Sequence, residues 1–316
     1  MRLKSALRRG VAAAVIAGIV VSSGIPAYAA RWDIANGDIT VKAGDAEGKN
    51  RVSQGEKEDV EDTNTVITGE SDKNTVTIDT SEGNVDVTFD DLKIDISGKK
   101  EGDGSGKTEV DGSGKTEGNV SGKKEGDGSG DSPVDAGKAA VTVQGNGDVT
   151  IELDGDNKLK SGSGNAGLEK NKHESKGTLT IKDDKGKDGS LTAEGGDDGA
   201  GIGGGIGSTG SSITIRGGAV EAVGGSNAAG IGDGAGPWSE PDPDTPPSNP
   251  NNIIICGDAE VTAKAGGSQM LDTKAPAIGG KYGEIPTENL SDADHKVTGG
   301  RLTRLNADGT VMEGMG

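Results

Sequence analysis

The chain has 316 residues, of which 58 are Gly, one is Cys and only 2% are aromatic. This composition excludes an ordinary enzyme core built on Phe, Tyr and Trp, and the single Cys excludes a disulfide-stabilised scaffold. With 52 Asp and Glu against 33 Lys and Arg, the formal net charge is -19, which argues against nucleic acid as a partner and against unaided binding to an anionic membrane.

Residues 1–30 have the pattern of a secretory signal peptide. A basic start precedes an apolar run from Val11 to Val21, and the small residues at 27–30 are typical of a cleavage site. The apolar run is too short for a membrane-spanning helix, which needs about 20 residues. We therefore expect a secreted protein, extracellular or associated with the cell surface, with no stable membrane insertion after signal cleavage.

Short apolar-polar-apolar triplets recur through the rest of the chain. They begin in residues 31–98, for example at Ile39–Val41 and Val85–Val87, and continue at Val149–Ile151 and Leu179–Ile181. Such a triplet directs two side chains to one face of a strand and one to the other. Because Gly, Asp, Asn and Ser separate the triplets, we expect short strands joined by turns.

Two segments lack these triplets. Residues 99–133 are a low-complexity stretch in which GKKEGDGSG occurs twice, and we expect a linker or loop there. Residues 236–252 are rich in Pro and Asp and read as a stiff acidic insertion.

Residues 134–316 contain an internal repeat. Three units begin at Leu179, Ile213 and Ile253, and each has two short strands followed by a Gly-rich corner of the AGIGGG type. One unit cannot bury its own apolar side chains, whereas stacked units bury a continuous column. We therefore expect an all-β protein, a right-handed parallel β-helix (a solenoid) with Gly-rich corners. The alternative, an antiparallel β-sandwich, predicts longer strands and hairpin turns.

These segments resemble a known family. The opening WDIANGDIT from Trp32, VTFDDLKIDISG from Val87, VTIELDGDNKLKSG from Val149 and the GAGIGGG corners are similar to bacterial secreted carbohydrate-binding domain proteins. The resemblance covers roughly residues 32–98 and 134–281. It implies a fold like that of pectate lyases and binding of acidic polysaccharide, such as polygalacturonate, with the help of calcium.

Carboxylates in turns are the candidate calcium ligands, because calcium prefers several oxygen ligands at once. The candidates are Asp154, Asp156, Asn157, Asp183, Asp184, Asp188, Asp197 and Asp198. The alternative is that each cluster is an ordinary solvated acidic surface.

Few side chains are suited to contact a sugar directly. Trp238 in the Pro-rich insertion and Tyr282 after the third corner are the aromatic candidates. Lys158 and Lys160 could form a basic patch for an acidic glycan, or belong to an ordinary mixed surface.

Three functions remain open. The first is non-catalytic binding of a polysaccharide, plant cell-wall or other acidic glycan. The second is a polysaccharide lyase or hydrolase; a lyase needs an Arg or Lys base whose pKa is lowered, and Arg216 is the one Arg on a repeat strand, with no evident acidic partner in the sequence. The third is a structural surface adhesin or spacer. We predict the first.

Overall fold

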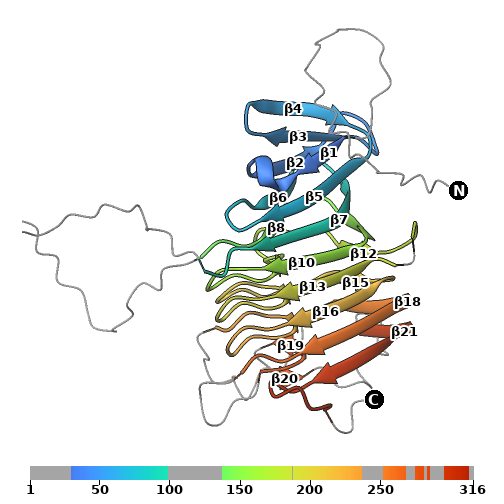
Figure 1. Cartoon of the computed structure of the whole chain (residues 1–316). Coiled ribbons are helices and arrows are strands. Elements are labelled where there is room, and N and C mark those ends of the chain that lie inside the picture. The colour runs from blue at the N-terminus through green and yellow to red at the C-terminus, as the bar shows by residue number, and fades with distance from the viewer. Residues whose placement is uncertain are drawn as a thin grey trace, which may run out of the picture.

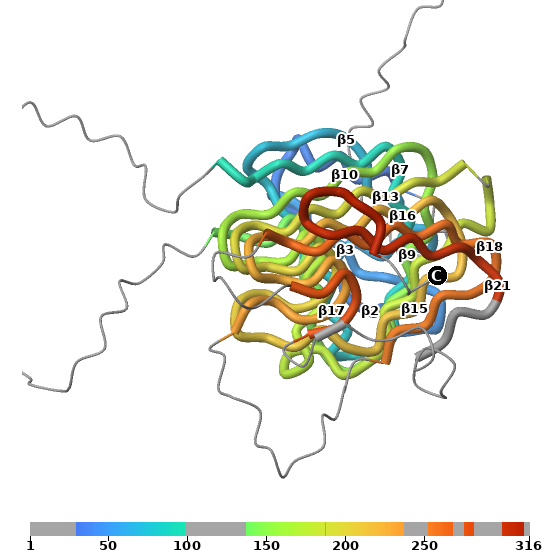
Figure 2. The backbone as a smooth tube through the Cα atoms, turned by 90° about the horizontal axis from the view of Figure 1, so that it is seen from below, coloured from blue at the N-terminus to red at the C-terminus, as the bar shows by residue number. Residues whose placement is uncertain are grey.

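The computed structural model describes residues 30–98, 137–186, 188–236, 252–267, 275–280, 283–284 and 295–312. Its units stack along one axis from the N-terminal to the C-terminal end (Figure 1). Viewed along that axis, they surround a common interior (Figure 2). Residues 1–29 of the expected signal peptide, the whole low-complexity linker and nearly all of the Pro-rich insertion lie outside the described residues.

The described strands form two sheets. Sheet A contains, in order of pairing, β1 (Arg31–Asp33), β5 (Thr65–Ser71), β7 (Val85–Asp95), β10 (Asp156–Lys160), β13 (Ser190–Glu194), β16 (Ala219–Val223), β18 (Ile253–Lys264), β15 (Ile213–Ile215), β12 (Leu179–Lys182) and β9 (Val149–Asp154), and β21 (His295–Leu305) pairs with β18. Sheet B contains β20 (Gly283–Glu284), β19 (Ile278–Gly280), β17 (Ile231–Gly232), β14 (Ile202–Gly203), β11 (Leu168–Glu169), β8 (Val141–Gly145), β6 (Val76–Thr80), β2 (Ile39–Ala43), β3 (Asn50–Gln54) and β4 (Lys57–Asp62).

The all-β class is confirmed. In the described part of the chain, the one helical element is η1 (Ile34–Asn36), a short 3-10 turn. No helix there is long and apolar enough to span a bilayer.

The strand order of sheet A returns on itself. Because β7 pairs with both β10 and β9, eight of the described strands form a closed parallel ring: β7, β10, β13, β16, β18, β15, β12 and β9. The expected open right-handed parallel β-helix is therefore wrong: these strands form a closed parallel barrel, accompanied by a second sheet. The ring closes because β7 and β18 are long strands. The first half of each pairs with one short strand and the second half with the next short strand in the chain.

The predicted repeat and its register are confirmed. Leu179 pairs with Ile213, and Ile213 with Ile253, so the first triplets of the three units lie side by side. The corner residues Ile202, Ile231 and Ile278 align in the same way in sheet B. All six of these side chains are fully buried. The repeat also extends toward the N-terminus, because β9 stacks on β12 and β7 stacks on β9.

Glycine at the corners is required by the close approach of neighbouring units. Gly203 and Gly232 have φ angles of 138° and 133°. A Cβ atom at Gly203 would collide with the carbonyl oxygen of Gly232, and one at Gly232 with that of Gly279. The AIG corner is therefore a packing requirement of the stack and not a phosphate-binding loop.

The N-terminal end carries an antiparallel extension that the triplet pattern does not predict. β3 pairs antiparallel with both β2 and β4, and most of β4 is exposed. Trp32 begins the stack as expected: it is buried, and its indole Nε1 donates to Asp62 Oδ2 at 2.8 Å. A polar, acidic outer strand protects this end of sheet B against edge-to-edge pairing with another chain.

Replacing Ile215 by Asp is expected to lower the free energy of unfolding by about 4 kcal/mol or more, because a carboxylate would replace a fully enclosed side chain. Thr214→Asp is the matched control, since Thr214 lies on the same strand with its side chain partly exposed, and its expected cost is below about 1 kcal/mol. Urea unfolding followed by circular dichroism measures both variants. Equal losses would contradict the register of β15.

Candidate functional site

The outer face of sheet A carries a row of hydroxyl groups. Thr150 on β9 pairs with Thr180 on β12, which pairs with Thr214 on β15. Asp86 on β7 extends the row on the other side of Thr150. Each Thr is the central residue of an apolar triplet, so the packing of the interior places these hydroxyls on the outside, one per strand.

A second, charged row runs beside the first. Thr88 on β7 pairs with Glu152 on β9, and Glu152 pairs with Lys182 on β12. Arg216 follows directly after β15, and its backbone N–H donates to Ile181 O at 2.9 Å. One carboxylate and two cations from three successive units therefore stand beside the hydroxyls.

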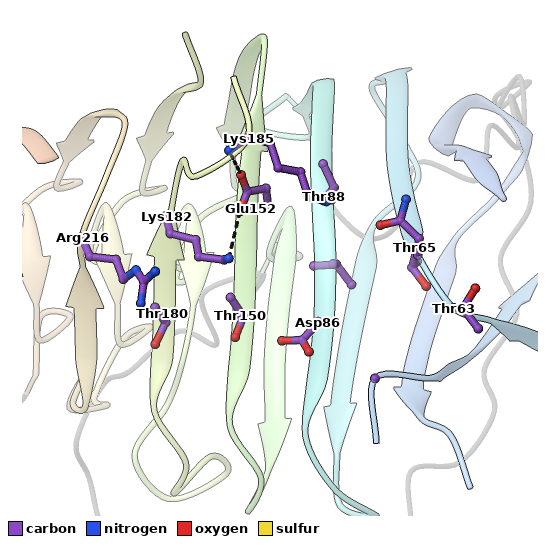
Figure 3. A pocket seen from close by; sticks show the side chains of 13 residues that line it. Thr63, Thr65, Asp86, Thr88, Thr150, Glu152, Thr180, Lys182, Lys185 and Arg216 are labelled. Carbon is purple, nitrogen blue, oxygen red and sulfur yellow. Dashed lines mark hydrogen bonds and ion pairs between the residues drawn. The ribbon is translucent and has the colours of Figure 1, made fainter. Parts of the chain in front are cut away.

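Except for Thr214, the residues of these rows line a groove of about 420 Å³. Its walls are completed by Gly48 and residues 63–65 at the N-terminal end, and by Lys185 from the connection between β12 and β13. Figure 3 shows Arg216, Lys182 and Glu152 side by side at three successive strands, with Lys185 close to Glu152 and Thr side chains beside them. The lining has three cationic side chains and two carboxylates, although the net charge of the chain is -19.

Glu152 is the most enclosed charged group in the described lining, with 3% of its surface exposed. Its Oε1 accepts the backbone N–H groups of Asp184 at 2.8 Å and Lys185 at 2.7 Å. Its Oε2 lies 3.1 Å from Lys182 Nζ. Oε1 therefore ties Glu152 to the next connection along the stack, whereas Oε2 makes an ion pair with Lys182 and has no hydrogen-bond partner among the described residues.

Asp184 neutralises two of the cations. Its Oδ2 lies 2.8 Å from Lys182 Nζ and 2.8 Å from Arg216 Nη2. The hydrogen bond that Lys182 donates to Asp184 raises the pKa of Lys182 and lowers the pKa of Asp184. Arg216 therefore has an acidic partner, which the sequence does not reveal. Lys185 differs: it is exposed, its Nζ lies 3.5 Å from Thr88 Oγ1, and no described carboxylate lies within 4.0 Å of it.

Comparison with protein-family models, curated proteins and solved structures found no match to this chain.

The structure brings some of the predicted calcium ligands together. A Cβ atom at Gly186 would approach both Asp154 Oδ1 and Asp188 Oδ1, so the turn after β9 and the connection after β12 are neighbours. Asp197 and Asp198 instead lie after β13 and accept hydrogen bonds from Ser226 and Asn227 of the next unit.

Several of these candidates already hold backbone or side-chain groups. The buried Asn157 amide accepts from Leu92 N at 2.9 Å and donates to Ser190 O at 3.0 Å. Asp183 is buried and accepts from Gly189 N, and Asp156 accepts from Ser190 Oγ. Within the described ranges, no group of three or more His, Cys, Asp or Glu side chains could hold a metal ion. Calcium binding stays a prediction, and no contact in the groove is assigned to an ion.

The predicted glycan contacts lie elsewhere. Lys158 and Lys160, on β10, pair with Glu194 at 2.9 and 3.5 Å and do not line the groove. Trp238 and Tyr282 lie outside the described residues.

The sequence pattern did not single out the Thr row or the charged side chains Glu152, Lys182 and Lys185. The signal that could have found most of them is positional: Glu152, Lys182 and Arg216 each directly follow the triplet of their unit.

Two other buried charged side chains, Glu169 and Lys170, lie at a corner of sheet B. Burial raises the pKa of Glu169 to about 7 and lowers the pKa of Lys170 to about 8. Lys170 Nζ donates to Ser211 O at 2.9 Å, and Glu169 Oε2 accepts from Ala166 N at 3.1 Å. Both side chains make hydrogen bonds with backbone groups that close the corner, so we assign them a structural role.

Glu169→Gln is expected to remove one component of the pH dependence of stability. The carboxyl pKa is raised in the folded state, so its contribution to stability is present at low pH and is lost as pH rises from about 4.5 to about 7, by about 3 kcal/mol. Denaturant unfolding of the unchanged protein and of Glu169→Gln, each at about pH 5 and about pH 8, measures this loss of stability. The other titrating groups are common to both proteins, so their effect cancels in the difference between the two unfolding free energies. A difference that does not change with pH would contradict an enclosed, protonatable Glu169.

Proposed function

We propose that the protein is a non-catalytic carbohydrate-binding protein that acts outside the cell and holds a stretch of acidic polysaccharide in the groove over β7, β9, β12 and β15. The observation that carries the proposal is the pair of parallel rows. Hydroxyl groups repeat at the strand spacing of about 4.8 Å, and cations stand beside them. A ligand that matches a repeating row is itself a repeating, extended polymer.

The chemistry of the lining fits a glycan that carries carboxylates. Thr and Asp side chains exchange hydrogen bonds with sugar hydroxyls. Arg216 and the lysines suit uronate carboxylates, because charge-assisted hydrogen bonds are stronger than neutral ones. The described lining contains no aromatic side chain, so binding here would depend on hydrogen bonds and charge rather than on stacking against sugar rings. The family resemblance of the sequence supports the same ligand class.

Binding is favoured over hydrolysis by the state of Glu152. A general acid must carry a proton and direct it at the substrate. Both oxygens of Glu152 instead face donors, two backbone N–H groups and an ammonium. The carboxylate thus serves as an acceptor within the protein.

The first test is affinity electrophoresis of the protein without residues 1–30 in gels containing polygalacturonate, with calcium and with chelator, and in gels containing neutral dextran. We expect polygalacturonate, and not dextran, to retard the protein. Retardation in the presence of chelator would assign the contacts to the protein's own cations. Retardation only in the presence of calcium would show that the ion takes part in binding. Unchanged mobility in every gel would contradict the proposal and favour a surface spacer.

Two charge changes should then move affinity in opposite directions. Lys185→Ala should weaken binding by about fivefold, the loss of one charge-assisted contact of about 1 kcal/mol, and Asp184→Asn should tighten binding because it releases Lys182 and Arg216. Lys264→Ala is the control for net charge, since Lys264 ends β18 outside the groove. Isothermal titration with oligogalacturonate measures all three. Equal weakening by Lys185→Ala and Lys264→Ala would show that net charge, and not the groove, governs binding.

A further inference from the structure

Glu152 lies at an outward position of β9 and is nevertheless almost fully buried. Its neighbours in the same row are Thr88 and Lys182. Lys185, which belongs to the connection after β12, joins them in the wall of the groove. Covering a carboxylate in this way is costly unless its oxygens are hydrogen-bonded.

The connection after β12 is longer than its equivalents in the neighbouring units. It spans residues 183–189, whereas Gly155 alone joins β9 to β10 and residues 216–218 join β15 to β16. A longer connection loses more conformational entropy when it is held in one position. Two consecutive N–H groups of this connection, at Asp184 and Lys185, donate to the same oxygen of Glu152.

We propose that Glu152 is the positioning residue of the groove: it anchors the connection after β12, so that Lys185 is held over the polymer. The inference rests on the proposed function. It assigns the role of Glu152 to its acceptor oxygens and not to its charge. The charge itself opposes an anionic ligand, so the two roles predict opposite effects of removing the side chain.

Two substitutions separate these roles. Glu152→Gln retains a carbonyl oxygen that can accept both N–H groups and removes the negative charge, so binding of oligogalacturonate should be as tight as in the unchanged protein or tighter. Glu152→Ala removes the acceptor, frees the connection and should weaken binding by about fivefold, the cost of about 1 kcal/mol of positioning. If Glu152→Ala does not fold, Glu152→Thr replaces it, since Thr occupies the same row at Thr88.

The matched controls are Glu221→Gln and Glu221→Ala. Glu221 is an exposed carboxylate on β16 of the same sheet and does not line the groove. Both variants change the net charge by the same amount, so their affinities for oligogalacturonate should be equal. Equal tightening by both Glu152 variants would overturn the inference, because it would show only the loss of repulsion. Equal weakening would also overturn it, because both variants lose the ion pair with Lys182, and that pairing rather than the anchored connection would then govern binding.

A readout without ligand keeps this inference distinct from the proposed function. Amide hydrogen exchange at Asp184 and Lys185 should be faster in Glu152→Ala than in Glu152→Gln or the unchanged protein, since an anchored N–H exchanges slowly. If no polymer binds the unchanged protein, the proposed function fails, and the exchange rates still decide whether Glu152 holds the connection. Unchanged exchange in Glu152→Ala would overturn the anchoring role.

Discussion

Parallel, in-register pairing of successive units is the constraint on which both the interior and the groove depend. A triplet such as Leu179–Ile181 loses its apolar contact with water only when the next unit places its own triplet alongside. The same register fixes the outer face, because the central residue of one triplet then lies beside the central residue of the next. Thr150, Thr180 and Thr214 are therefore aligned by the packing of the Ile, Val and Leu side chains on the other face, and the groove needs no separate element to hold its floor.

The electrostatics of the groove differ from those of the chain as a whole. Three cations from two units gather there in a protein of net charge -19, and Asp184 and Glu152 hold two of them in place. Buried or half-buried charges of one sign would repel each other, so the carboxylates allow Lys182 and Arg216 to stand on adjacent strands. In the proposed function, the same carboxylates would oppose a polyanion, and Asp184 would compete with the ligand for Lys182 and Arg216. Lys185, which has no such competitor among the described residues, is left to make the first contact.

Much of the fold could be predicted from the sequence, because the triplet pattern reports directly which side chains face inward. The strands at Val149–Ile151 and Leu179–Ile181 and the alignment of three repeats follow from that pattern. Closure of the ring does not follow from the triplet pattern. Gly257 and Asp258 read as a turn but lie within the continuous strand β18, at a β-bulge where Gly257 has a φ of 67°. The polar strands β3 and β4 carry no apolar alternation to reveal them. In the groove, Arg216 comes from a different unit than Lys182 and Lys185, and the contact of Asp184 with Arg216 depends on stacking that no local pattern encodes.

The central claim is that the outer row of sheet A, and not another row of the same composition, holds the polymer. Sheet B offers an internal comparison, because Thr40, Thr77 and Thr142 form an equally aligned and partly exposed row. Methyl-Thr NMR of the protein titrated with oligogalacturonate reports both rows in one sample. We expect the resonances of Thr150 and Thr180, which line the groove, to shift and saturate while those of Thr40, Thr77 and Thr142 stay unchanged. Equal shifts in both rows, or shifts confined to sheet B, would contradict it.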